Sequence, residues 1–160
     1  MSLFPQILTI LCAVGSGMAS GAFLTFSTFT MAGLKRLPPS QGAATMQAIN
    51  KEAPTPSFMV LLFGTGAACL TLMAYAAYDV RAPGSTWHLI AGALYLLGVV
   101  LMTIAYHVPR NDRLERLDPG SPEETAYWAV YQRAWVRMNH VRTIAPLVSA
   151  VLFAVSLGAE

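Results

Sequence analysis

Four long apolar segments dominate the pattern of hydrophobic and polar positions along the chain. They cover residues 3–31, 58–78, 87–106 and 141–157, and the first three contain no Asp, Glu, Lys or Arg. A helix of about 20 apolar residues crosses the roughly 30 Å hydrocarbon core of a bilayer. The pattern therefore predicts four transmembrane helices, with the short fourth span continuing a helix that begins before it.

Helix signals also occur between the spans. After Pro38, apolar residues recur at helical spacing until Pro54, which predicts a short amphipathic helix between the first two spans. Ser121 and Glu124 have the spacing of a capping box, and we expect the helix that starts there to run without a break into the fourth span. Pro146 is expected to kink that helix or loosen one turn of it.

Composition supports one all-α membrane domain over residues 1–160, a four-transmembrane-helix bundle. Hydrophobic residues make up 55% of the chain and charged residues 11%, against about 25% charged in an average soluble domain. A net charge of +2 and this apolar content exclude disorder and nucleic-acid binding. No Lys or Arg precedes the first apolar run, so we expect that run to remain as a span and not to act as a signal peptide.

The distribution of Lys and Arg predicts the orientation. Of the ten such residues, Arg81 alone follows the second span, and the other nine lie between spans one and two or between spans three and four and at their junction. Positive residues in short loops stay on the cytoplasmic side. We therefore expect both termini outside and the two longer loops in the cytoplasm, in a bacterial inner membrane.

Small and aromatic residues in the first span allow two interpretations. Gly17 and Gly21 form a small-xxx-small pattern, which predicts close packing inside the bundle or, alternatively, a seam of a homo-oligomer. Phenylalanines at 23, 26 and 29 are expected to pack in the core or against lipid, with a wall of an aromatic pocket as the alternative. Cys12 and Cys69 lie within apolar runs and are expected to be buried thiols.

The helix leading into the fourth span carries a chemically distinctive stripe. At 100° per residue, four residues fall within about 40° of Trp135. They are Trp128, Tyr131, Asn139 and Arg142. The stripe is thus aromatic and ends in an amide and a guanidinium, while Arg133, Arg137 and His140 lie on roughly the opposite face.

Polar residues gather at one predicted membrane depth. They are Asn50, His107, Asn111, Asp112, Asn139, His140 and Arg142. Such groups are costly near hydrocarbon unless they are paired or face a cavity, so they are candidates for function. The alternatives are a helix end for Asn50, an interface marker for His107, an ordinary turn for Asn111 and Asp112, and snorkelling for Arg142. His88 is expected at the opposite interface.

A metal site is an alternative that the spacing does not favour. His107 and His140 with Asp112 could supply three ligands, but no H-x-x-x-H or H-E-x-x-H spacing occurs and the ligands would have to converge from different helices. The chain also has no Gly-rich phosphate loop and no serine nucleophile elbow.

Three motifs in this order resemble the anthrone oxygenase-like family, the DUF1772 domain. They are the Ile-Asn pair ending at Asn50, the Val-Pro-Arg-Asn-Asp segment 108–112, and Asn-His-Val-Arg-Thr at 139–143. At position 107 the family pattern leads us to expect Asn, and this chain has His107. The resemblance implies a small membrane protein that oxidises anthrones or related phenols with molecular oxygen and without a prosthetic group.

That resemblance suggests a mechanism for the polar cluster. His140 or His107 would be the base, and Arg142 would stabilise the oxyanion. Asn50, Asn111 and Asn139 would orient a small aromatic substrate, with Trp135 and Tyr131 stacking on its rings. Because His140 points about 100° away from Asn139 on the helix, His107 is the better base if the stripe faces a pocket.

Two other functions fit the same residues. The chain could be a non-enzymatic membrane protein, such as a small-molecule binder, a transport accessory or a subunit of a complex. It could also be a metal-dependent redox protein that uses His107 and His140. The lipid bilayer is a partner in every case.

Overall fold

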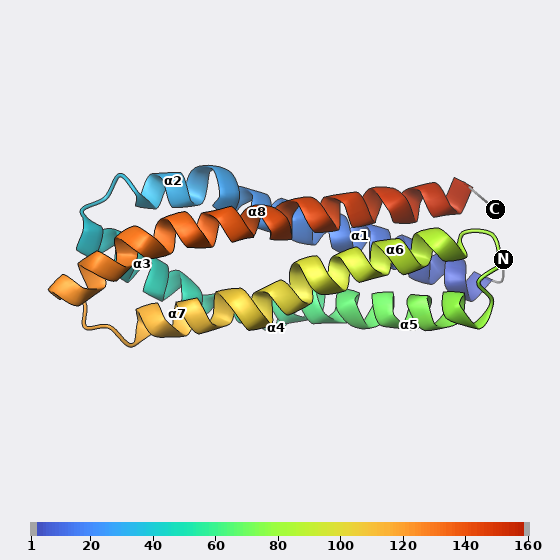
Figure 1. Ribbon diagram of the computed structural model, residues 1–160, viewed down its shortest axis with the longest axis horizontal. Coiled ribbons are helices and arrows are strands. Elements are labelled where there is room, and N and C mark those ends of the chain that lie inside the picture. Colours follow the sequence, from blue (N-terminus) through green and yellow to red (C-terminus); the bar gives the residue numbers. More distant parts are fainter. Residues whose placement is uncertain (1–2, 159–160) are drawn as a thin grey trace.

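The computed structural model describes residues 3–158, and the regular elements in this range are all helices. Four of them are long and apolar enough to cross a membrane: Leu3–Leu34, Pro56–Tyr78, Ser85–Glu115 and Pro122–Gly158. They run along one common axis (Figure 1). The predicted all-α bundle of four spans is confirmed, and the chain is an integral membrane protein.

The first two spans are each built from several helical segments. Span one consists of α1 (Leu3–Thr25), the π-helical turn η1 (Phe26–Thr30) and α2 (Met31–Leu34). The predicted amphipathic helix is α3 (Pro39–Glu52). Span two consists of α4 (Pro56–Met59), η2 (Val60–Gly64) and α5 (Thr65–Tyr78).

The third span is longer than the sequence indicates. It consists of α6 (Ser85–Tyr95), η3 (Leu96–Leu101), η4 (Thr103–His107) and α7 (Val108–Glu115). We expected it to end at Tyr106, because Pro109 lacks the backbone N–H of a regular helix. The π-helical turns directly before Pro109 change the hydrogen-bonding register there, and the helix continues. Asn111 and Asp112 therefore lie on α7 and not in a turn.

The fourth span begins at the predicted cap. Ser121 Oγ accepts a hydrogen bond of 3.0 Å from the backbone N–H of Glu124. The Glu124 carboxylate in turn accepts from Gly120 N at 2.7 Å, one residue before the position that a standard capping box would use. From there α8 (Pro122–Gly158) is continuous through Pro146, which confirms the expected unbroken helix.

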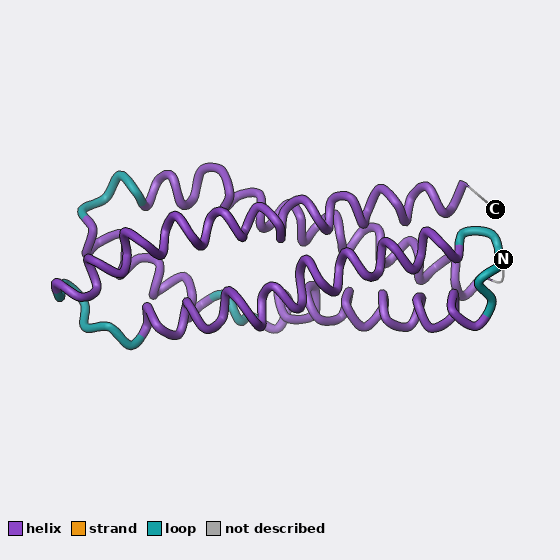
Figure 2. The backbone as a smooth tube through the Cα atoms, viewed as in Figure 1, coloured by secondary structure: helices purple, strands orange, loops and turns teal. Residues whose placement is uncertain are grey.

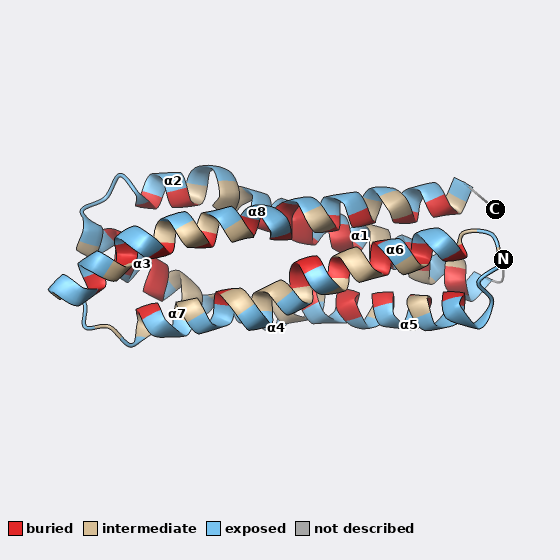
Figure 3. Ribbon diagram, viewed as in Figure 1, coloured by how far each residue is buried: buried red, intermediate tan, exposed pale blue. Residues whose placement is uncertain are grey.

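Buried residues lie on the inner faces of the four spans and exposed residues on the outer faces (Figure 3). Many of the exposed residues are large and apolar. Cys12 and Cys69 are fully buried in the core, as expected. Exposed residues on the outer faces include Val60 and Leu97, at 70% and 61% exposure. Large apolar side chains exposed in this number indicate a surface that contacts lipid.

Span one and α8 are joined by buried hydroxyl groups. Ser20 Oγ donates to the carbonyl of Thr143 at 2.7 Å, and the hydroxyls of Ser16 and Ser149 lie 3.5 Å apart. His88, expected at an interface, is buried at 2% exposure, with its Nε2 3.2 Å from Thr9 Oγ1 and 3.1 Å from Ser156 Oγ. These hydrogen bonds join span one, α6 and α8, and hydrogen bonds between helices stabilise packing in a membrane.

The two glycines of the small-xxx-small pattern in span one do not allow close packing. Gly17 and Gly21 face outward, and a Cβ atom added at either would meet nothing within 4 Å. Close approach occurs instead at Gly15, which lies against Thr65, and at Gly98, where a Cβ would overlap Ala145 of α8. The predicted packing of Gly17 and Gly21 inside the bundle is therefore wrong, while the homo-oligomer seam stays a prediction.

The loops before α3, before α6 and before α8 lie at the ends of the bundle, whereas the short loop between α3 and α4 lies further in (Figure 2). The loop between α5 and α6 lies at the end where α1 starts and α8 finishes. The loops before α3 and before α8 lie at the opposite end. Both ends of the described chain therefore lie at the same end of the bundle (Figure 1).

We expect Gly98→Ala to destabilise the bundle, because the new methyl group overlaps Ala145 where η3 crosses α8. Overpacking of this kind costs about 1–3 kcal/mol. The measurement is the free energy of unfolding in mixed detergent micelles. Gly17→Ala is the matched control, since its methyl group enters open space. Equal stability of the two variants would contradict the close contact.

Candidate functional site

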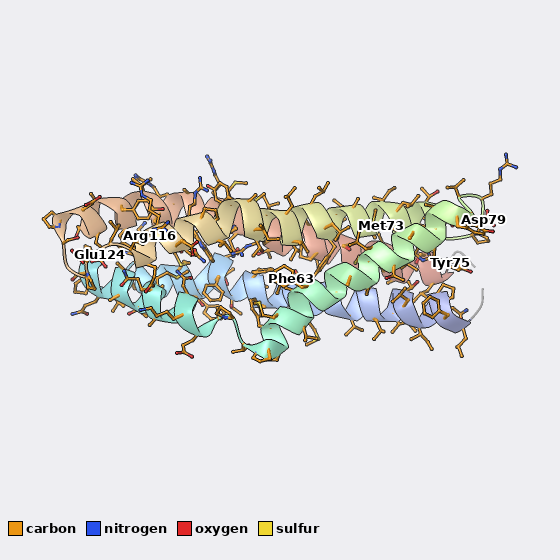
Figure 4. The ribbon with its side chains drawn as sticks, turned by 90° about the horizontal axis from the view of Figure 1, so that it is seen from below. Phe63, Met73, Tyr75, Asp79, Arg116 and Glu124 are labelled. Carbon is orange, nitrogen blue, oxygen red and sulfur yellow. The ribbon has the colours of Figure 1, made fainter. Side chains whose placement is uncertain are left out.

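A cavity of about 350 Å³ opens between span one, α3, span two, span three and α8. Phe63, on its wall, lies midway along the bundle, whereas Arg116 and Glu124 lie near one end (Figure 4). The cavity extends from the middle toward that end, because Glu115 also lines it. Its apolar wall includes Phe23, Phe26, Phe58, Leu62 and Trp135.

Asn111 connects the third span to the aromatic stripe. Its carboxamide oxygen accepts a hydrogen bond from the Tyr131 hydroxyl at 2.7 Å and another from Trp135 Nε1 at 3.0 Å. This contact depends on the continuation of the third span into α7, which brings Asn111 opposite α8. Trp135 lines the cavity, and Tyr131 lies behind it.

Arg142 is buried at 5% exposure and is held by neutral groups. Its Nε and Nη2 donate to Asn139 Oδ1 at 3.0 and 2.7 Å, and its Nη1 is 3.4 Å from Thr103 Oγ1. The guanidinium carbon lies 4.3 Å from the centre of the Phe23 ring and 5.0 Å from a Trp135 ring centre. Within residues 3–158 no carboxylate oxygen lies within 4.0 Å of a guanidinium nitrogen of Arg142. The ion pair found in this range joins Lys51 Nζ to Glu115 Oε1 at 2.7 Å.

Asn139 positions Arg142 and does not itself line the cavity. Its amide nitrogen donates to the Phe23 carbonyl and to Ser27 Oγ, both at 2.9 Å. All its polar groups are thus used within the protein. Asn139 and Tyr131, both expected to contact the substrate, are placed one layer behind the cavity wall, where they hold Arg142 and Asn111.

His107 lines the cavity at 1% exposure. Neither ring nitrogen has a hydrogen-bond partner; the backbone of Met138 acts on the ring without reaching hydrogen-bond geometry. The imidazole packs edge-on against Trp135, with ring centres 4.9 Å apart, and against Tyr106 at 5.3 Å. Its neutral form keeps a lone pair that no protein group occupies.

Unpartnered buried polar atoms concentrate around this cavity. Among the described residues they are Asn50 Nδ2, both ring nitrogens of His107, Glu115 Oε2 and Glu124 Oε1. Three of the four residues concerned line the cavity, the exception being Glu124. Because buried polar groups in proteins are almost always paired, these atoms indicate where a bound molecule or water would make its contacts.

The structure separates the two histidines. His140 is exposed and lines a different groove on the outside of the bundle, so it does not share the cavity with His107. The alternative in which His107 and His140 act in one site is therefore wrong, because the two side chains lie in different places. In the described range no group of three or more His, Cys, Asp and Glu side chains is arranged to hold a metal ion, and His107, His140 and Asp112 do not converge.

Phe23 and Phe26 line the cavity, which is the alternative that the sequence analysis gave for them, whereas Phe29 is 68% exposed. Other features of the cavity were not found from the sequence. Thr103 lies within an apolar span and gave no signal. The ion pair between Lys51 of α3 and Glu115 of α7 joins two loop-proximal helices that no local pattern relates.

Comparison with known protein families supplies one match. A family model described as anthrone oxygenase matches residues 58–152, which is more than half of the chain. The matched segment contains His107, Asn111, Trp135 and Arg142 of the cavity wall. No curated protein and no solved structure matches the chain.

We expect Asn111→Ala to destabilise the protein by about 1–3 kcal/mol, because it leaves the Tyr131 and Trp135 donors without an acceptor. A double-mutant cycle with Tyr131→Phe should give a coupling energy of about 1 kcal/mol. The measurement is the free energy of unfolding of the four proteins. Asp112→Ala, an exposed neighbour, is the control. Additive effects would contradict the hydrogen bond.

Proposed function

The chain belongs to the anthrone oxygenase family, and we propose that it oxidises an anthrone-like or other polycyclic phenolic substrate with molecular oxygen. One observation carries the proposal. His107 and Arg142 are both buried in the wall of one apolar cavity, the first without a hydrogen-bond partner and the second without a carboxylate partner. A base and a cation in this state suit a reaction that forms an anion.

The cavity suits a flat aromatic substrate. Its volume of about 350 Å³ falls in the range of about 300–1,000 Å³ that small-molecule sites occupy. Phe23, Phe58 and Trp135 offer ring faces and edges on its wall. Few polar groups interrupt this surface, so a polycyclic phenol would be oriented mainly by those few.

The first chemical step is removal of a proton. The ring methylene of an anthrone is acidic, because the electron pair left behind delocalises onto the carbonyl oxygen. A neutral His107 would take this proton on a ring nitrogen, and Arg142 would stabilise the oxyanion. A dry cavity strengthens both effects, since no water competes for the charges.

The second step uses the electrons of this anion. It passes one electron to molecular oxygen, and the two radicals combine to a peroxide anion at the former methylene carbon. Protonated His107 would return its proton to this anion and give the hydroperoxide. Loss of water then gives a carbonyl group. In sum, the methylene and one oxygen molecule become a carbonyl and one water molecule. We propose that no prosthetic group takes part, because the substrate anion itself supplies the electrons.

Other cavity residues would orient the substrate. Asn50 has a buried amide nitrogen with no partner in hydrogen-bond geometry, although its side chain interacts with the Tyr131 hydroxyl. This amide could donate to a substrate carbonyl or hydroxyl. The oxygen of Asn111 already accepts two hydrogen bonds, so only its amide nitrogen is left for the substrate. Trp135 would pack against the rings.

We also propose an orientation for the protein in a bacterial inner membrane. The cavity extends from the middle of the bundle toward the end that carries the loops before α3 and α8, where most Lys and Arg residues lie. The positive-inside rule places this end in the cytoplasm and the two termini outside. A substrate would then be taken up from the cytoplasm or from the inner leaflet.

Oxygen uptake by the purified protein with an anthrone tests the function. We expect a rate well above uncatalysed autoxidation. His107→Gln should lower this excess about 100-fold or more, as expected for loss of a general base. Arg142→Gln should lower it about 100-fold, through loss of oxyanion stabilisation. The metal content is read on the same samples.

Matched controls come from the outside of α8. His140→Gln and Arg137→Gln remove the same side-chain types outside the cavity and should keep nearly the full rate. An equal loss in His140→Gln would contradict the assignment of the base. A folded wild-type protein that only matches the autoxidation rate would remove anthrones as substrates and favour a non-enzymatic role.

Single-cysteine labelling in intact cells tests the orientation. Cys12 and Cys69 are fully buried, so we expect neither native thiol to react with the labelling reagent. We expect Arg81→Cys to react with a membrane-impermeant thiol reagent in intact cells, and Arg116→Cys to react only after permeabilisation. The reverse pattern would show that the cavity end faces outward.

A further inference from the structure

A second groove lies on the outside of the bundle, between span one and α8. It measures about 450 Å³ and is open to the surroundings. From span one it is lined by Ser27, Thr28, Met31, Ala32 and Lys35, and from α8 by Gln132, Arg133, Val136, Arg137 and His140. None of the functional roles proposed above uses this groove.

The groove concentrates positive charge. Lys35, Arg133 and Arg137 are exposed cations, His140 adds a titratable ring, and no Asp or Glu is among the lining residues. Within residues 3–158 the cations of this groove form no ion pair with a carboxylate; the ion pair found there, between Lys51 and Glu115, lies elsewhere. Three like charges held together without counter-ions favour binding of an anion.

The cations continue into an apolar stripe along the same face of α8. Arg133, Arg137 and His140 are followed at helical spacing by four exposed apolar residues. These are Ile144, Val148, Val151 and Val155, which are 40–58% exposed. The face is therefore cationic near the loops and apolar toward the middle of the membrane. This order of polarity matches a lipid with an anionic headgroup and acyl chains.

We propose that this groove binds the headgroup of an anionic membrane phospholipid. The phosphate lies against Arg133, Arg137 and Lys35, because guanidinium groups donate paired hydrogen bonds to phosphate oxygens. One acyl chain follows the stripe from Ile144 to Val155. A small free anion would use the cations and leave the stripe unused, so the stripe favours a lipid over free phosphate.

The site is separate from the cavity. The two are lined by different residues, and the hydrogen bond between Ser27 and Asn139 lies in the wall between them. Lipid binding in this groove can therefore be tested independently of whether the protein oxidises anthrones. The site requires only that α8 lies in a bilayer with its cationic segment at headgroup depth.

Lipid titration of the detergent-solubilised protein, followed by native mass spectrometry, tests the proposal. The probes are phosphatidylglycerol and phosphatidylcholine with identical acyl chains. We expect saturable binding of phosphatidylglycerol at least about tenfold tighter than that of phosphatidylcholine. The variant Arg133→Gln/Arg137→Gln should lose at least about tenfold of the phosphatidylglycerol affinity.

The matched control is Arg36→Gln/Arg116→Gln, which removes two exposed arginines that do not line the groove. It should bind phosphatidylglycerol within about twofold of wild type, and circular dichroism checks that both variants are folded. An equal loss in the control would show general surface electrostatics and overturn the site. Equal binding of both lipids, or full competition by free glycerol phosphate, would overturn it as well.

Discussion

The buried guanidinium of Arg142 is the constraint on which the rest of the structure depends. A charge at the edge of a membrane span is costly unless neighbouring groups hydrogen-bond it or it faces a cavity. Here the Oδ1 atom of Asn139 accepts two hydrogen bonds from the guanidinium, and the amide nitrogen of Asn139 donates to the backbone carbonyl of Phe23 in span one. Thr103 reaches the same guanidinium from span three. One cation thereby fixes the relative positions of three spans at the level of the cavity.

The aromatic stripe of α8 is held in place from the opposite side by Asn111. This contact exists because the third span does not stop at Pro109, and α7 carries Asn111 alongside Tyr131 and Trp135. The π-helical turns before Pro109 also determine where His107 lies, against Trp135 and in the cavity wall. The π-helical turns and the continuation of the helix past Pro109 thus build one side of the candidate site.

The two faces of α8 have separate roles. The face with Trp135 and Arg142 turns inward and closes the cavity, whereas the face with Arg133, Arg137 and His140 turns outward. His140 and Arg142 are two positions apart and lie in different environments because helical geometry rotates them by about 200°. Residue type alone does not distinguish His107 from His140, and burial does.

The sequence by itself determined the four spans, the class of fold, the cap at Ser121 and the inward stripe of α8, because each depends on local spacing and on the free energy of transfer into hydrocarbon. It also identified the polar residues of the candidate site, since polar groups are conspicuous beside apolar spans. The tertiary structure decided which of them share a cavity. His107 joins Arg142 there, His140 does not, and Tyr131 and Asn139 support the wall from behind. These outcomes depend on how helices that are distant in the chain pack together, and local sequence patterns do not determine that packing.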